Sequence, residues 1–158
     1  MGIRIDGKAV SAAFREKLKE DVARLTEQGM QPGLAVVIVG DDQASRVYVN
    51  NKKKACQQLG IYSEEYALPG ETTEEELLEL VNRLNNRSQI HGILVQLPLP
   101  RHIREKVVLE AIDPRKDVDA FHPQNVGRIM IGDYRFLPCT PAGILELIRS
   151  TGVPVEGK

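Results

Sequence analysis

The sequence predicts an α/β fold, a three-layer α/β/α domain built around a mostly parallel sheet. Two observations support this prediction. Two short runs, residues 34–39 and 91–95, are dominated by apolar side chains, which is typical of strands buried on both faces of a parallel sheet. Segments with apolar residues at helical spacing alternate with these runs. Because that order implies crossover connections, it favours helices on both faces of the sheet.

Helices are expected where apolar residues recur every three or four positions. In the first of them, residues 8–28, the apolar positions are Val10, Phe14, Leu18, Val22 and Leu25. The others are expected over residues 45–59, 72–86, about 103–111 and 141–150. Residues 61–68 form a third expected strand. The stretch between the last two helices, rich in Asp, Pro and His, is expected to be a loop.

The ends of these helices carry their own signals. Gly60 follows the second helix and is expected to end it. Asp41-Asp42 are expected to form a turn and the start of that helix. Glu74–Glu76 place acidic groups at the positive end of the third helix. Thr140 is expected as the N-cap of the last helix, with Pro141 at its first position.

Composition narrows the class of protein. The chain has 158 residues, a net charge of −1 and no clustered basic patch, so neither nucleic acid nor an anionic membrane is expected as a partner. No apolar run is long enough to span a membrane, and the N-terminus lacks the apolar core of a signal peptide. Cys56 and Cys139 lie far apart, which predicts no metal site and fits reduced thiols in the cytoplasm.

Three consecutive lysines lie in the expected helix 45–59. At about 100° per residue, Lys52 falls near Tyr48, whereas Lys53 and Lys54 fall on the solvent-facing flank. Helix geometry alone favours a Lys52 that extends along the rim of the core with its charge in water. The functional alternative is a partly desolvated amine that exchanges protons near neutral pH, with Tyr48 stacking on a flat substrate.

A Tyr-x-x-x-Lys pair also occurs in short-chain dehydrogenases, which carry a glycine-rich cofactor turn near the N-terminus. This sequence has no such turn there, and no GxGxxG or GxxxxGK motif anywhere. A short-chain dehydrogenase is therefore disfavoured, and no cofactor-binding residue is expected in this chain.

In open α/β sheets, ligands bind beyond the carboxyl ends of the strands. Gln96 follows the strand at 91–95; it either ties down the loop or serves as a neutral neighbour that orients a catalytic amine. Asp117 and Asp119 either form a turn or offer a carboxylate to two adjacent N–H donors, as on the edge of a pterin. His122 lacks a paired Ser, Cys or second His and is interpreted as loop structure.

Four long stretches resemble one known family, in the same order and at the same separations. They are VGDDQASRVYVNNKKKAC, GILVQLPLP, DPRKDVDAFHPQNVGR and PCTPAGILELI. With them, essentially the whole chain resembles the bifunctional methylenetetrahydrofolate dehydrogenase/methenyltetrahydrofolate cyclohydrolase family. Gln43 stands where many members have proline, which does not touch the expected chemistry.

The resemblance implies roles for individual residues. Lys52 is the implied catalytic lysine, Gln96 the glutamine that tunes it, and Tyr48 the third member of the catalytic set. Asp119 is implied to hold the pterin edge. The substrate-binding residues implied in full are Ser45, Tyr48, Val49, Asn50, Asn51, Lys52, Val95, Gln96, Leu97, Pro98 and Asp119.

The resemblance also implies an organisation. Residues 1–138 are expected to form the folate-binding catalytic domain, and residues 139–158 a linker helix and the start of an NADP-binding Rossmann domain that is missing from this chain. The full-length enzyme is expected to be a homodimer that oxidises 5,10-methylenetetrahydrofolate with NADP and hydrolyses the product to 10-formyltetrahydrofolate. This chain alone is expected to be inactive or feeble.

Two alternatives remain open at this point. One is a stand-alone module that binds folate or pterin. The other is a family member with an altered activity, either specific for NAD or retaining only the dehydrogenase.

Overall fold

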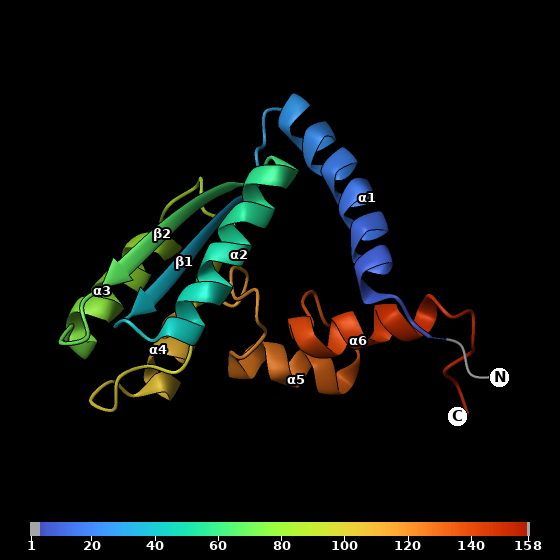
Figure 1. Cartoon of the computed structure of the whole chain (residues 1–158). Helices are drawn as coiled ribbons and strands as arrows, with labels where there is room; N and C mark the ends of the chain where they lie inside the picture. Colours follow the sequence, from blue (N-terminus) through green and yellow to red (C-terminus); the bar gives the residue numbers. More distant parts are fainter. Residues whose placement is uncertain (1–3, 158) are drawn as a thin grey trace.

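The computed structural model describes residues 4–157 and shows, within them, an α/β domain of three parallel strands and six helices (Figure 1). The predicted fold class is confirmed. In chain order the elements are α1 (Gly7–Glu27), β1 (Gly33–Val39), α2 (Gln43–Leu59), β2 (Tyr62–Leu68), α3 (Glu74–Asn85), β3 (Gly92–Val95), α4 (Glu105–Ala111), α5 (Pro123–Ile131) and α6 (Cys139–Arg149).

The strands pair in the order β2-β1-β3, and both pairs are parallel. β1 is the central strand, and six of its seven residues are buried, as its apolar sequence predicts. β2 forms one edge and is mostly half-buried. On the other side, Asp117 extends the sheet by a single parallel bridge to Ile93 of β3. The parallel order places the carboxyl ends of all three strands along one edge.

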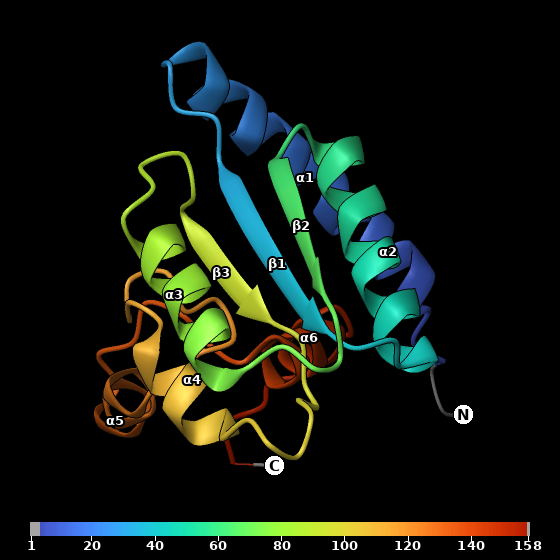
Figure 2. The same ribbon diagram turned by 90° about the vertical axis from the view of Figure 1, so that its left-hand side faces the viewer.

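The two faces of β1 are covered by different helices. Val37 and Val39 pack in a core cluster with residues of α3 and α4. Val36 and Ile38 pack instead with Val49 of α2. This division follows from the alternation of side chains along a strand. Figure 2 shows α3 and α4 on one side of the sheet and α2 on the other, which confirms the three layers.

The ends of α2 and α3 follow the predicted signals. Asp42 caps α2, because its Oδ2 accepts a hydrogen bond from Ser45 N at 2.7 Å. Gly60 ends the same helix in the left-handed region, at a φ of 77°. Thr73 and Glu76 form a capping box at the start of α3.

The prediction for the start of α6 is wrong. The helix begins at Cys139, with Pro138 in the N-cap position and no side-chain cap. Thr140 and Pro141 therefore lie inside the first turn, and Thr140 does not cap the helix. The first turn accommodates Pro141 because its backbone nitrogens have no acceptors within the helix.

Helix α5 lies in the stretch that the sequence predicts to be a loop. Its local signals are ordinary: His122 Nδ1 accepts a hydrogen bond from Gln124 N at 3.1 Å, Pro123 opens the helix, and Gly132 ends it at a φ of 78°. His122, which the sequence predicts as loop structure, caps this helix with its ring. Proline is common at the first position of a helix, so Pro123 is a local signal in the sequence that predicts the start of α5.

The apolar stripe predicted for α1 is only partly buried. Val22 is buried, whereas Phe14 remains 55% exposed. The helix contacts both α2 and α6. Among residues 4–157, no helix combines the length and the apolar character needed to cross a membrane.

Candidate active site

The three consecutive lysines of α2 have different environments. Lys52 is half-buried, and its Nζ donates a hydrogen bond to Gln96 Oε1 at 3.0 Å. Lys53 is exposed and pairs with Glu65 of β2 at 3.3 Å. Lys54 is exposed. The structure therefore singles out Lys52, and it joins α2 to the loop that follows β3.

The buried stripe of α2 is centred on Lys52 rather than on Tyr48. The buried residues of this helix are Ser45, Val49, Cys56 and Leu59. At about 100° per residue, their mean direction lies about 25° from Lys52 and about 65° from Tyr48. Tyr48 accordingly stands at the edge of the stripe, 63% exposed. It is one turn from Lys52, as predicted, but on an open surface.

Gln96 is held so that its amide oxygen faces Lys52. Its backbone N donates to Val37 O of the central strand at 2.8 Å. Its Nε2 donates to Leu97 O at 2.8 Å, which leaves Oε1 to accept from Lys52. The lysine thus has an uncharged partner in a fixed orientation, which orients the amine without adding negative charge.

The loop after Gln96 is anchored at several points. The peptide between Leu97 and Pro98 is cis. Leu99 N donates to Glu105 Oε1 at 3.0 Å, and His102 Nε2 lies 2.8 Å from Thr72 O. These contacts fix the loop against the starts of α3 and α4.

Asp119 lies close enough to Lys52 for the two charges to interact. Its side chain is half-buried, and burial raises the pKa of the Asp119 carboxyl, while the positive charge of Lys52 acts in the opposite direction. The structure therefore brings together three residues from separate parts of the chain: Lys52, Gln96 and Asp119.

Asp117 and Asp119 play different parts in the structure. Asp117 is only 2% exposed, and its Oδ2 accepts from His122 N at 2.8 Å and from Asn125 Nδ2 at 2.9 Å. Asp117 therefore satisfies the backbone at the start of α5. Asp119, two residues on, is the carboxylate of the pair that lies on the side of Lys52.

The structure adds Cys139 to this group of residues. The residue as a whole is exposed, yet partial burial of its thiol and the negative charge of Asp119 raise the pKa of that thiol. Its Sγ lies 3.8 Å from Val118 O. Sequence reasoning missed Cys139 because a single cysteine carries no pattern; only its place in the PCTP stretch marks it.

The other predicted binding residues are placed in three ways. Three of them are buried, each at most 5% exposed: Ser45, Val49 and Val95. Leu97 is half-buried and Pro98 is exposed, both beside Gln96. Asn50 and Asn51 are exposed, and Asn50 points about 160° away from Lys52 on the helix. The structure does not bring Asn50 to the group around Lys52.

The turn from β1 into α2 shows whether this chain can hold a dinucleotide. Dinucleotide-binding domains place a pyrophosphate at the N-terminus of the helix after the first strand. Here the Asp42 carboxylate occupies that helix end, and it would repel a pyrophosphate. Within residues 4–157, no group of three or more His, Cys, Asp or Glu side chains is arranged to hold a metal ion.

Comparisons with known proteins place this site in a family. Residues 5–119 match the model of the tetrahydrofolate dehydrogenase/cyclohydrolase catalytic domain. The bifunctional protein FolD of Geotalea daltonii is 58% identical over 154 residues, covering 98% of this chain and 55% of that protein. The chain thus spans about half the length of the curated relatives it matches.

Solved structures agree with the sequence comparison. The bifunctional enzyme FolD from Campylobacter jejuni superimposes with a TM-score of 0.94 at 49% identity, covering 98% of this chain and 55% of that one. The Trypanosoma brucei enzyme, solved with NADP and an inhibitor, gives 0.94 at 40% identity, covering 99% and 54%. On these matches, the chain belongs to the tetrahydrofolate dehydrogenase/cyclohydrolase family.

Proposed function

We propose that this chain is the folate-binding catalytic domain of a bifunctional one-carbon enzyme. The enzyme oxidises 5,10-methylenetetrahydrofolate to 5,10-methenyltetrahydrofolate, with NADP as hydride acceptor, and hydrolyses that product to 10-formyltetrahydrofolate. The observation that supports this best is the hydrogen bond of 3.0 Å from Lys52 Nζ to Gln96 Oε1, inside the region that matches the family.

The hydrolysis follows from what a lysine beside a neutral amide can do. Water adds to the methenyl carbon between the two folate nitrogens, and Lys52, when neutral, accepts the proton that the water loses. The bond from that carbon to one nitrogen then breaks, and Lys52 returns the proton to that nitrogen. The hydroxyl group on the carbon releases its own proton to water as it becomes the formyl carbonyl, so that the reaction as a whole releases one proton. A permanently charged lysine would repel the cationic substrate, which gives a reason for Gln96 rather than a carboxylate as its partner.

Asp119 is proposed to hold the pterin ring. An ionised carboxylate presents two acceptor oxygens to the adjacent N–H groups of a 2-amino-4-oxo ring. Its place near Lys52 supports a folate whose reacting carbon faces the amine. Tyr48, exposed one turn from Lys52, is proposed to stack on the flat ring. The remaining predicted binding residues are also proposed to contact the folate. Among those on α2, Asn50 lies farthest from Lys52 around the helix.

The proposal includes a longer protein. In it residues 1–138 form the catalytic domain, and residues 139–158 lead into an NADP-binding domain. The relative from Geotalea daltonii is matched over only 55% of its length, which leaves room for such a second half. We refer to this chain continued by that second half as the intact protein, and propose it to be a cytoplasmic homodimer. Because the Asp42 carboxylate occupies the start of the helix that directly follows β1, NADP is assigned to the second half.

Activity assays on the intact protein and on residues 1–158 test this function. We expect the intact protein to reduce NADP+ with 5,10-methylenetetrahydrofolate and to hydrolyse the methenyl cation, both followed by absorbance. Residues 1–158 alone should reduce no NADP+ and hydrolyse slowly. NADP+ reduction by residues 1–158 would contradict the assignment of NADP binding to the second half of the intact protein. Folate binding by an intact protein with neither activity would favour the stand-alone binding module.

A further inference from the structure

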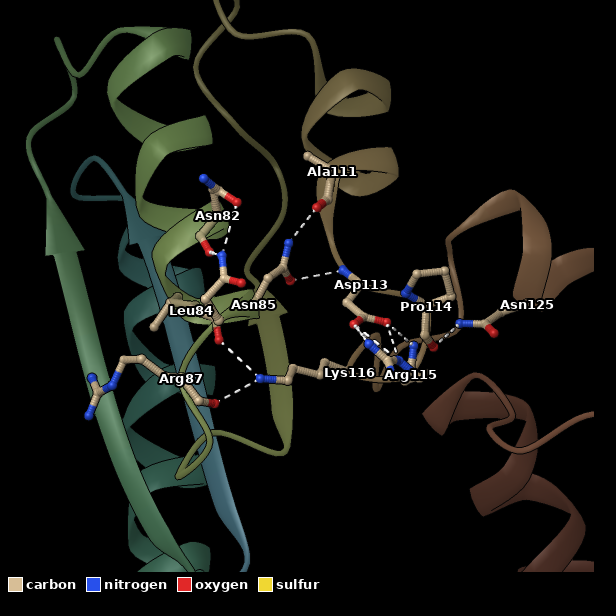
Figure 3. A network of polar contacts seen from close by, with 11 residues as sticks. Asn82, Leu84, Asn85, Arg87, Ala111, Asp113, Pro114, Arg115, Lys116 and Asn125 are labelled. Carbon is tan, nitrogen blue, oxygen red and sulfur yellow. Dashed lines mark hydrogen bonds and ion pairs between the residues drawn. The ribbon is translucent and has the colours of Figure 1, made fainter.

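Lys116 joins the loop that carries Asp119 to two elements of the fold at once. Its backbone oxygen accepts a hydrogen bond from Ile93 N of β3 at 2.7 Å. Its Nζ donates to Leu84 O at 3.2 Å and to Arg87 O at 2.8 Å, at the end of α3 (Figure 3). The same residue is therefore fastened to β3 by its main chain and to α3 by its side chain.

The end of α3 is a suitable acceptor for an ammonium group. Leu84 O is one of the last carbonyls of α3, which carry partial negative charge, and Arg87 O lies two residues beyond the helix. Each also accepts a backbone N–H, from Arg87 and Ile90 respectively, at 3.2 Å, and a carbonyl oxygen can accept a second hydrogen bond. Lys116 is half-buried, and this burial lowers the pKa of its amine, while the charge of Asp113 acts in the opposite direction. The hydrogen bonds to the two carbonyls thus offset part of the free-energy cost of removing the Lys116 ammonium from water.

A second clamp strengthens the same junction. Asn85, the last residue of α3, donates through Nδ2 to Ala111 O at 2.8 Å and accepts at Oδ1 from Asp113 N at 2.9 Å. Figure 3 shows the hydrogen bonds of Asn85 and of Lys116, both of which join the region of α3 to the loop. The Asn85 clamp holds the start of the loop, and Lys116 holds the part nearest Asp119.

The chain has little freedom between Lys116 and Asp119. Asp117 is buried and pairs with Ile93. Val118 packs over Gly92, where an added Cβ would come within 2.6 Å of Val118 Cγ1. Since these contacts leave the segment from Lys116 to Asp119 little slack, we expect a displacement of Lys116 to be passed on to Asp119.

We propose that Lys116 is a positioning residue that holds the Asp119 carboxylate in place for the pterin ring of the folate. This inference rests on the proposed function, because it takes Asp119 as the folate contact. Lys116 itself lies on the far side of the loop, with its ammonium at the end of α3, and does not touch the substrate.

Steady-state kinetics of the intact protein test the proposal. Lys116→Met keeps the length of the side chain and removes its hydrogen bonds. We expect its KM for the folate to rise about tenfold, the size of a lost or misaligned hydrogen bond to a charged group, with kcat nearly unchanged, as for a loss of uniform binding. Lys116→Arg keeps the charge and should restore part of the affinity. Lys106→Met is the matched control, because Lys106 is 84% exposed.

A double variant separates positioning from a general loss of stability. With Asp119→Asn already present, Lys116→Met should raise KM no further, because the contact it positions is gone. Faster amide exchange at Ile93 in Lys116→Met would show the loosened loop without any ligand. A purely structural role instead predicts a lower Tm with KM unchanged well below that temperature, and would overturn the proposal.

The outcomes also distinguish this inference from the proposed function. If Asp119→Asn raises KM and Lys116→Met does not, Lys116 is no positioning residue and the folate contact of Asp119 stands. If Asp119→Asn leaves KM unchanged, the folate contact is wrong and the inference falls with it.

Discussion

Lys52 and Lys116 are both half-buried lysines that join a helix to a loop, yet their ammonium groups are held differently. Lys116 donates to two backbone carbonyls, at 3.2 and 2.8 Å. Within residues 4–157, Lys52 donates one hydrogen bond, to the side-chain amide of Gln96 at 3.0 Å. Two backbone acceptors fix an ammonium, whereas one leaves N–H groups for water or substrate. The acceptors of a lysine, more than its burial, thus separate a structural role from a candidate catalytic one.

Replacing Lys52 should have the largest effect on activity, because its role is proposed to be catalytic rather than structural. In the intact protein, Lys52→Met or Lys52→Gln should lower the rate of methenyltetrahydrofolate hydrolysis by about 10²–10⁴-fold, the usual contribution of a general acid–base group. The measurement is the initial rate of loss of methenyl absorbance.

Lys53 and Lys54 provide matched controls for that experiment. Lys53→Met breaks only the exposed pair with Glu65, and Lys54 is exposed. Both variants should stay within about twofold of the wild-type rate, because exposed ion pairs contribute little. Wild-type hydrolysis in Lys52→Met would remove the catalytic assignment and leave Lys52 a lysine at the rim of the core.

The pH dependence of folate binding tests the proposed role of Asp119, the carboxylate near Lys52. Burial raises the pKa of Asp119 above the usual 3.8. Only the ionised form accepts two N–H donors, so binding is complete above the raised pKa and is lost as the pH falls through it. The KM for the folate should therefore rise by about tenfold per pH unit below that pKa, and at a higher pH than an ordinary aspartate would give.

Two variants make this pH experiment specific. Asp119→Asn should have a high KM that no longer changes over this pH range. Asp113→Asn is the control, because the pKa of Asp113 is lowered by its hydrogen bond with Arg115, so Asp113 stays ionised where Asp119 protonates. An unchanged pH profile in Asp119→Asn would show that another group controls binding.

Periodicity predicts much of the Lys52 site from the sequence. Helical spacing alone separates Lys52 from Lys53 and Lys54. It misplaces the centre of the buried stripe, because Ser45 and Val49 are buried by their contact with the sheet rather than by any local signal. Which side of a helix meets a sheet is decided by the fold, and a single-helix projection cannot supply it.

The loop around Lys116 could not be predicted in the same way. Its partners Leu84 and Arg87 lie 32 and 29 residues away in the sequence. Asp117 and Asp119 are both aspartates of one short loop. The contacts of Asp117 with Ile93, His122 and Asn125 decide which of the two carboxylates is buried. The positions of Lys116, Asp117 and Asp119 depend on contacts between segments that are distant in the sequence, so local patterns could not predict them.

Arg87 links the Lys116 junction to the edge of the sheet, and this link gives the smallest expected effect. Its carbonyl accepts from Lys116, and its guanidinium bonds both carboxylate oxygens of Glu64 on β2, at 2.5 and 2.8 Å. The hydrogen bonds from Arg87, Tyr62 and Tyr66 lower the pKa of Glu64 to about 2. Glu64 therefore stabilises the fold fully above pH 4.5, and this stabilisation is lost as the pH falls towards 2.

Glu64→Gln should thus lower the free energy of unfolding by about 1 kcal/mol at pH 7, since solvent screens a partly exposed pair. The difference from wild type should shrink below pH 4.5, as measured by urea unfolding across pH. Glu79→Gln, at an exposed position of α3, is the control and should match wild type. A difference that persisted at pH 2 would mean that packing, rather than the charge of Glu64, holds the end of α3 to which Lys116 is bound.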